Sequence, residues 1–254
     1  MLKFLFGKPE TKSKFKHELL GNTEPICPYC RVALDKMPGR KKKCANCGNY
    51  MYIRTRPSDR KRVVVTEQDA AKIDEQWMIE DGTYEAYLAD KQKFEARKAE
   101  LASRFGHQPS DDDVHWSLYN EQLIECAKSG DWGFYRNIRF NMAELLRREK
   151  KDRASLETYL EVSYLDANGP RNMGGIFDPG LVREFPPFDP AMAFQAPGIA
   201  ARIRSLSQSL SLGESDLRAV FLQIGERTHQ NMKLPVSPEK AWKDLEVELH
   251  KSSK

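Results

Sequence analysis

Four of the five cysteines in this chain form two pairs with the same internal spacing. Each pair has two residues between its members, and thirteen residues separate the pairs; the four are Cys27, Cys30, Cys44 and Cys47. Cysteines at this spacing can turn their sulfurs toward one point while nearby backbone amides donate hydrogen bonds to them. Pro28 stiffens the first turn, and Gly48 permits the chain to leave the second. The spacing therefore predicts a metal site.

We expect the metal to be a structural Zn²⁺ ion, because four protein thiolates leave no coordination position for water or substrate. Iron in a rubredoxin-like site stays open as an alternative, since it accepts the same four thiolates. Disulfides or free thiols are the other alternative, but Cys126 is then an odd thiol. The apolar run in the first residues is too short for a signal peptide, and no membrane-length segment follows. We therefore expect a cytoplasmic protein with no membrane partner.

The net charge of +4 is distributed unevenly along the chain. Residues 1–65 hold 16 Lys and Arg against 5 Asp and Glu, a formal charge of +11, so the other 189 residues carry 4 minus 11, or about −7. With 254 residues and 40% hydrophobic residues, the chain is long enough for one sizeable core and a small module. We therefore expect two parts of opposite electrostatic character.

Many of the basic residues lie in two groups, at 40–43 directly before the second cysteine pair and at 54–62 after it. Residues 50–56 alternate like a half-exposed strand, which predicts that Arg54 and Arg56 share a face beside Tyr50 or Tyr52. Guanidinium groups beside aromatic rings suit phosphate contact and base stacking, so nucleic acid is the specific hypothesis. An acidic protein partner, or charge that only keeps a small module in solution, stays open. The candidate contact residues are Arg40, Lys41, Lys42, Lys43, Arg54, Arg56, Arg60, Lys61 and Arg62.

Beyond residue 65 the pattern becomes helical. Thr66 is expected to cap a helix that ends at Asp81-Gly82, and Thr83 a second helix that reaches Arg104. The apolar stripe expected on the second helix is Tyr84, Tyr87, Leu88, Phe94, Leu101 and Phe105.

The next segment offers a possible catalytic or divalent-metal cluster. Its residues are His107, Asp111, Asp113 and His115. Pro109-Ser110, however, comes directly before the aspartates, which is typical of the start of a helix. The free amides and the dipole at a helix start attract negative charge, so we expect the aspartates to stabilise a helix and not to bind a metal. The apolar stripe expected on that helix is Trp116, Tyr119, Leu123, Cys126 and Ala127, so Cys126 is expected to be buried.

Residues 132–166 are expected to form a pair of helices joined by a polar turn. This pair resembles one tetratricopeptide repeat over about 34 residues. The packing positions in that resemblance are Met142, Ala143, Leu146, Ser155, Tyr159 and Val162. Arg139 and Ala167 depart from the repeat, which has an aromatic residue and a proline at these positions. The resemblance implies a concave face that holds a peptide or a protein. An ordinary helix bundle is the alternative.

A Gly- and Pro-rich loop at residues 167–197 follows this pair. It is expected to be anchored against the helices by Phe177, Phe185 and Phe188. Three final helices are then predicted, opened by Pro197, Ser215 and Ser237-Pro238. His229 is expected to cap the last carbonyl groups of its own helix or to act there as a cation.

The chain as a whole resembles uncharacterised bacterial or prophage-type proteins in which a rubredoxin-knuckle zinc ribbon is fused to a tetratricopeptide-like helical region. The expected fold is mostly α, with a small β zinc ribbon at the N-terminus followed by an all-helical, tetratricopeptide-like or bundle domain. The expected domains are a basic arm at 1–24, the zinc ribbon at 25–65, connecting amphipathic helices at 66–106 and a helical domain at 107–254.

These patterns favour a noncatalytic zinc-binding adaptor. The basic ribbon is expected to contact nucleic acid or an acidic surface, and the helical domain to contact a protein. One alternative is an enzyme, such as a nuclease or hydrolase, but the sequence lacks a nucleophile elbow, a phosphate-binding loop and a second metal motif. Another is a structural component of a larger assembly.

Overall fold

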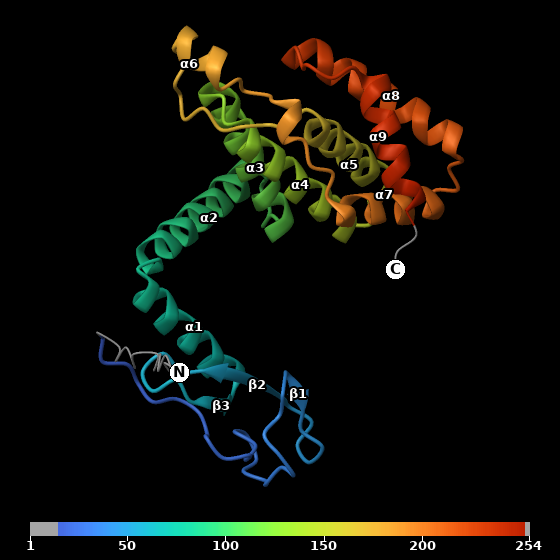
Figure 1. Ribbon diagram of the computed structural model, residues 1–254. Coiled ribbons are helices and arrows are strands. Elements are labelled where there is room, and N and C mark those ends of the chain that lie inside the picture. Colours follow the sequence, from blue (N-terminus) through green and yellow to red (C-terminus); the bar gives the residue numbers. More distant parts are fainter. Residues whose placement is uncertain (1–14, 252–254) are drawn as a thin grey trace, which may run out of the picture. The chain divides into compact units, whose positions relative to one another are not determined.

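The computed structural model describes residues 15–251, which form two compact units that divide between Lys93 and Phe94 (Figure 1). The first unit contains a small antiparallel sheet, one helix and the first part of a second helix, and the second unit is helical. The expected fold class, mostly α with a small amino-terminal β module, is confirmed. Most of the predicted basic arm falls on residues 1–14, which lie outside the described residues.

The sheet has three strands in the order β1-β2-β3, and both pairings are antiparallel. The strands are β1 (Lys42–Lys43), β2 (Tyr50–Thr55) and β3 (Arg62–Val65). On its other edge, β3 also exchanges backbone hydrogen bonds with Asn22 through Val64. The amino-terminal segment before the first cysteine is thereby tied to the sheet.

The apolar run of β3 is continuous because both faces of the strand are buried. Val63 and Val65 face α1 (Glu67–Asp81), whereas Val64 faces the cysteines. The two hydrophobic clusters are Leu20, Val63, Val65, Ala70 and Ile73 on the helix side, and Cys27, Cys44, Met51 and Val64 on the cysteine side. The cysteines are thus part of one of the two small cores of this unit.

The ends of α1 follow the predicted signals. The Thr66 hydroxyl accepts a hydrogen bond from the Asp69 amide at 3.1 Å, and Gly82 ends the helix in the left-handed conformation, with φ of 71°. The indole nitrogen of Trp77 donates to the Thr55 carbonyl oxygen at 2.7 Å. This bond fixes the helix against the end of β2.

The expected apolar stripe of the next helix is only partly buried. The helices here are α2 (Tyr84–Phe105) and α3 (Asp111–Ser129). Leu101 of α2 packs against Val114 and Leu118 of α3, whereas Tyr87 and Phe105 are exposed. On α3, Val114 and Leu118 are buried, whereas the expected stripe residues Trp116, Tyr119, Leu123 and Cys126 are half-buried and Ala127 is exposed.

The predicted pair at residues 132–166 is confirmed as two packed antiparallel helices. They are α4 (Trp132–Arg148) and α5 (Asp152–Ala167). Ser155 is fully buried, and its hydroxyl donates to the Ala143 carbonyl oxygen at 2.9 Å, so small residues bring the helices close together. The guanidinium group of Arg139, the residue that departs from the repeat pattern, binds the carboxylate of Glu161 on α5. The tetratricopeptide resemblance itself stays a prediction.

The Gly- and Pro-rich loop is anchored differently from the prediction. It contains a short helix and a 3-10 turn, α6 (Pro179–Glu184) and η1 (Pro190–Met192). Phe188 is buried, with its ring centre 5.4 Å from that of Trp132. Phe177 and Phe185, however, are 58% and 52% exposed, so the prediction was wrong for these two. Hydrogen bonds hold the loop instead: the Asp189 amide donates to the Gly169 carbonyl oxygen at 2.9 Å.

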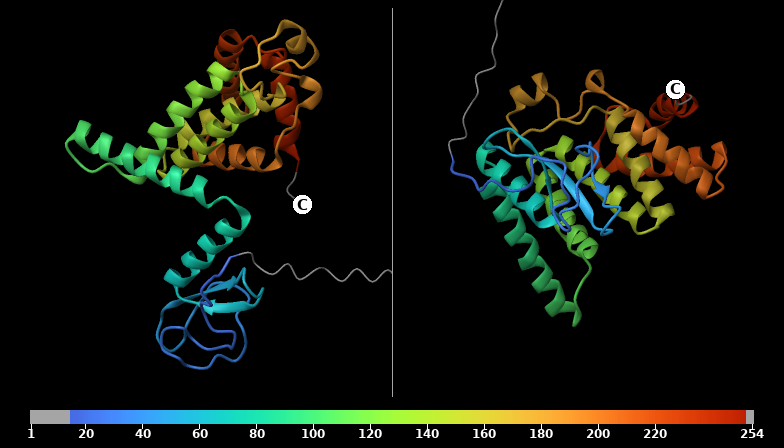
Figure 2. Two further views of the ribbon diagram at one scale, coloured as in Figure 1. Left: turned by 90° about the vertical axis from the view of Figure 1, so that its left-hand side faces the viewer. Right: turned by 90° about the horizontal axis from the view of Figure 1, so that it is seen from below.

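Three final helices complete the second unit: α7 (Pro197–Ser209), α8 (Glu214–Met232) and α9 (Pro238–His250). Together with α4, they surround α5 (Figure 2). The predicted starts at Pro197 and Ser237-Pro238 are confirmed. The predicted cap at Ser215 was wrong, because Gly213 precedes the helix and its amide donates to the Asp216 carboxylate.

His229 does not cap its own helix as predicted. Its Nδ1 atom lies 3.0 Å from the hydroxyl of Tyr164, and that hydroxyl donates to the Val236 carbonyl oxygen at 2.7 Å. Nδ1 is therefore the donor of the first bond, and the ring joins α8 to α5. Within residues 15–251, no helix has both the length and the apolar character that crossing a bilayer requires.

Candidate metal centre

The two cysteine pairs form turns with the same backbone hydrogen bonds. In the first, the Cys27 amide donates to the Val32 carbonyl oxygen at 2.9 Å, and the Arg31 amide donates to the Cys27 carbonyl oxygen at 3.0 Å. The second turn repeats both bonds at equivalent positions, from Cys44 to Asn49 at 2.8 Å and from Gly48 to Cys44 at 3.0 Å. The spacing seen in the sequence is therefore matched by a repeated local structure.

The four sulfur atoms lie close together. Sγ of Cys27 is 3.8 Å from that of Cys47, Sγ of Cys30 is 3.8 Å from that of Cys44, and all four lie within 4.8 Å of one another. A tetrahedral zinc ion with Zn–S bonds of about 2.3 Å requires sulfurs about 3.8 Å apart. The four residues therefore fit one metal ion. Among residues 15–251, they form the one group of three or more possible ligands at such distances.

Burial and hydrogen bonds set the protonation of these thiols. Burial raises the pKa of Cys27 to about 11. The side chain of Asn46 and the amide of Val32 lower the pKa of Cys30 to about 6, and amides of the second turn, that of Cys47 first, lower the pKa of Cys44. Cys27 thus needs a nearby cation to be ionised at neutral pH, and a bound metal supplies one.

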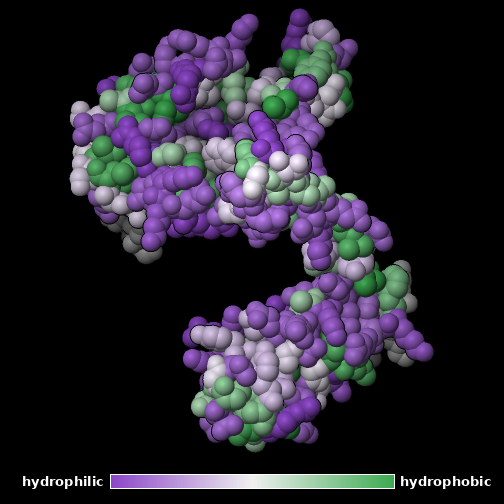
Figure 3. Space-filling model, turned by 180° about the vertical axis from the view of Figure 1, so that it is seen from behind, coloured by the Kyte–Doolittle hydropathy of each residue, from purple (hydrophilic) through white to green (hydrophobic). Residues whose placement is uncertain are grey.

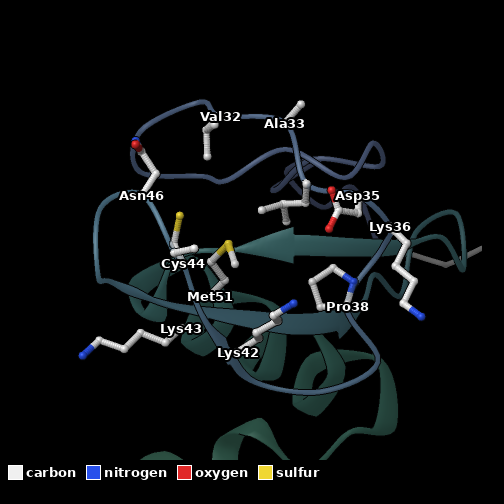
Figure 4. A pocket seen from close by; sticks show the side chains of 12 residues that line it. Val32, Ala33, Asp35, Lys36, Pro38, Lys42, Lys43, Cys44, Asn46 and Met51 are labelled. Carbon is white, nitrogen blue, oxygen red and sulfur yellow. The ribbon is translucent and has the colours of Figure 1, made fainter.

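A cavity of about 240 Å³ lies beside Cys44, between the segment at 32–38 and β1 with the second turn. Cys44 and Met51 lie side by side at this cavity in Figure 4, and Lys36 and Lys43 extend away from them in opposite directions. The rest of the lining is mixed, with apolar side chains as well as Asp35 and Lys42. The lining contains three lysines and one aspartate, so its net charge is positive.

The predicted basic residues fall into three environments. Arg54 and Arg56 already have carboxylate partners: Arg54 binds Asp74 through two bonds of 2.7 and 2.9 Å, and Arg56 binds Asp59 at 3.0 and 2.5 Å. Arg56 is only 6% exposed and Arg54 is half-buried, so both of these candidate contact residues have guanidinium groups that are already paired within the module. Arg60 stacks on the ring of Trp77, at 4.4 Å from the ring centre.

The remaining candidates are exposed. The guanidinium of Arg62 donates to the Gly39 carbonyl oxygen. The others are Arg40, Lys41, Lys42, Lys43 and Lys61. The exposed cations therefore lie in and before β1, which pairs with β2, and in the turn between β2 and β3.

A hydrogen-bonded group around Glu67 was not foreseen from the sequence. The Tyr52 hydroxyl donates to the Glu67 carboxylate at 2.5 Å, and the Glu67 amide donates to the Tyr29 hydroxyl at 3.2 Å. The two tyrosines thus meet at the first residue of α1. The contact from Tyr29 spans 38 positions in the chain, and no periodicity or spacing signals it.

The four residues considered as a second cluster are not brought together. Asp113 and Ser110 form a capping box at the start of α3, so the predicted helix start is confirmed. Asp111 binds Lys98 at 2.6 Å, and the His115 ring lies 5.0 Å from that of Phe94. Cys126, expected to be buried, is half-buried, and partial burial raises the pKa of its thiol.

Comparison of the chain with protein-family models, with curated proteins and with solved structures found no match. The first unit offers four thiols at the spacing of one metal ion. Exposed lysines and the exposed Tyr50 lie on the neighbouring strands.

Proposed function

We propose that this chain is a noncatalytic adaptor whose amino-terminal module is folded by a structural zinc ion. The observation that carries this proposal is the set of four sulfurs, with two cross-pair distances of 3.8 Å. Four thiolates fill a tetrahedral zinc ion and leave no position for water or substrate. Tetrahedral thiolate sites select zinc or iron, and zinc is the usual structural ion in closed sites of two such turns.

The size of the surrounding core supports a folding role for the metal. On the cysteine side of the sheet, the fully buried apolar side chains other than cysteine are Met51 and Val64. Such a core is too small to hold the two turns together alone, so metal binding supplies free energy of folding.

The basic module is proposed to bind nucleic acid. Residues 1–65 carry a formal charge of +11, and zinc with four thiolates adds a net charge of −2. The module therefore stays strongly positive after metal binding. The exposed lysines at positions 41–43 are the main candidates for phosphate contact. An acidic protein surface is the competing ligand, and the experiment below includes it.

The helical unit is proposed to bind a protein. Segment 176–194 exposes six large hydrophobic side chains: Ile176, Phe177, Leu181, Phe185, Met192 and Phe194. Clusters of exposed apolar side chains support a role in protein contact. On the face shown in Figure 3, hydrophilic residues predominate and the hydrophobic residues lie in separate patches. An adaptor needs one surface for each partner. The lysines at 41–43 belong to the first unit, and the apolar side chains of segment 176–194 belong to the second.

Fluorescence anisotropy tests the nucleic-acid half of this proposal. The zinc-loaded full chain is titrated into labelled DNA and RNA at several salt concentrations. The triple change Lys41→Ala, Lys42→Ala and Lys43→Ala should weaken binding at least about tenfold and flatten its salt dependence, because phosphate contacts release counterions. The matched control removes three exposed lysines outside the sheet: Lys72, Lys91 and Lys128.

The control should bind like the original chain. Equal losses in both triple variants would show only a general effect of net charge. Binding to poly-glutamate that is as tight as binding to nucleic acid would instead favour an acidic protein partner. Absence of nucleic-acid binding at low salt would overturn the proposal.

A further inference from the structure

We infer that the outer face of the β1–β2 hairpin is a stacking platform for single-stranded nucleic acid, with Tyr50 as the ring that contacts a base. This inference rests on the proposed nucleic-acid function, and it names the ligand class and the residues. The surface is called the tyrosine face and consists of Tyr50, Tyr52, Lys41 and Lys43.

The strand register places these residues on one side of the hairpin. Lys43 lies opposite Tyr50 across the pair, and Lys42 lies opposite Met51. Successive residues of a strand point to opposite faces, and cross-strand partners point to the same face. Met51 is fully buried against the cysteines. Tyr50 and Lys43 are therefore on the side that faces away from the metal site.

The tyrosine face combines an exposed ring with adjacent positive charge. Tyr50 is 52% exposed. The Lys41 ammonium lies 4.9 Å from the centre of the Tyr50 ring and 4.5 Å from that of Tyr52, and the Lys43 ammonium lies 5.9 Å from that of Tyr50. A base stacked on Tyr50 would therefore have its neighbouring phosphates within reach of two lysines.

The rest of the module holds this face in place. The Tyr52 hydroxyl is bound to Glu67 at 2.5 Å, which fixes its ring against the start of α1. Arg54, the next residue but one along β2, is already paired with Asp74. The lysines, rather than the β2 arginine, are thus the cations available to a phosphate on this face. A platform that is ordered before binding loses less conformational entropy when the ligand arrives.

The exposed ring favours single strands over duplexes. Bases within a duplex stack on one another, and a protein ring stacks on a base only where that base is unstacked. Phosphate contacts alone would not distinguish the two forms, because both present a charged backbone. Tyr50 therefore supplies the preference, and the lysines supply affinity for either form.

The experiment uses anisotropy with the zinc-loaded full chain, labelled oligothymidylate, a duplex of equal length, and heparin as a polyanion without bases. Tyr50→Leu should lower the single-strand affinity about tenfold and leave the slope of log K against log salt unchanged. Tyr50→Phe keeps the ring and should restore binding. The double change Lys41→Ala and Lys43→Ala should reduce that slope by about 1.4, at about 0.7 for each lost phosphate contact.

The control is Tyr87→Leu, which removes an exposed tyrosine of α2, and it should leave affinity unchanged. Zinc content and circular dichroism of Tyr50→Leu establish that it is folded. One outcome would overturn the stacking inference and leave the proposed function in place. In it, the original chain binds nucleic acid, the lysine substitutions weaken that binding, and Tyr50→Leu has the same affinity as Tyr87→Leu. An equal loss of heparin binding in Tyr50→Leu would also overturn the inference. If the original chain binds neither strand form at low salt, the proposed function itself fails.

Discussion

Arg31 and Gly48 occupy equivalent positions in the two cysteine turns, and both have left-handed backbones, with φ of 64° and 74°. Each donates its amide hydrogen to the carbonyl oxygen of the first cysteine in its pair at 3.0 Å. The left-handed conformation is easily adopted by glycine and is costly for a residue with a Cβ atom. One of the two turns therefore contains backbone strain that the other avoids.

Substitutions at these two positions should change zinc affinity in opposite directions. Arg31→Gly should raise the apparent affinity about fivefold, since relief of about 1 kcal/mol in a metal-coupled fold appears as tighter binding. Gly48→Ala should lower it by a similar factor. A Cβ at position 48 would find its nearest neighbour, Lys43 Cε, at 3.9 Å, so its cost is in the backbone alone. Competition with a chromophoric chelator measures both, and equal affinities in all three proteins would contradict the prediction.

The two arginines of the β2 region should differ in their contribution to stability. Arg56→Ala removes the buried partner of Asp59 and a bond to the Leu20 carbonyl oxygen, and it should cost about 3 kcal/mol. Arg54→Ala breaks a partly exposed pair and should cost less than about 1 kcal/mol. Hydrogen exchange at the β2 and β3 amides measures both free energies of opening. Similar exchange rates in the two variants would show that the buried arginine contributes no more to stability than the partly exposed one.

The capping box of α3 should be sensitive to acid. Bonds from the Ser110 hydroxyl and amide lower the pKa of Asp113 below its ordinary value of 3.8. A lowered carboxyl pKa stabilises the fold at pH values above 3.8, and this contribution is lost as the pH falls through the lowered value. Ser110→Ala should cost about 1 kcal/mol and move the pKa of Asp113 upward. NMR titration of the carboxyl group follows the shift, and an unchanged pKa would be inconsistent with the cap.

The crossing of α4 and α5 should not tolerate a larger side chain. Ser155 is fully buried against Ala143, so Ser155→Leu should destabilise the second unit by about 2 to 3 kcal/mol through overpacking. Ala154 is the adjacent, exposed residue, and Ala154→Leu is the matched control, with an expected change within about 0.5 kcal/mol. Urea denaturation followed by circular dichroism compares the two. Equal midpoints would indicate that the helices separate to make room.

Signals carried by a few neighbouring residues predicted structure well. The cap at Thr66, the helix starts after Ser110 and at Ser237-Pro238, and the end at Gly82 were foreseen, because each depends on hydrogen bonds or dihedral angles within one turn of chain. The cap predicted at Ser215 was wrong. The cysteine spacing likewise predicted two similar turns whose sulfurs meet.

Features that depend on distant residues were missed. Arg54 was considered only as a contact for an external ligand, and its internal partner Asp74, 20 positions away in the chain, was not foreseen. Phe177 and Phe188 have the same side chain and lie in one loop, yet only Phe188 reaches a buried site, beside Trp132. Aromatic content shows that a loop can be anchored, and tertiary packing decides which ring does so.

The central claim is that one zinc ion bound by four thiolates folds the amino-terminal module, and elemental analysis of the full chain purified without chelator tests it directly. We predict one zinc ion per chain. Cys27→Ser should lose the ion and the protection of the β2 and β3 amides, whereas Cys126→Ser, outside the site, should keep both. A chain that binds no metal, or a Cys27→Ser variant that keeps its zinc and its folded sheet, would contradict the claim.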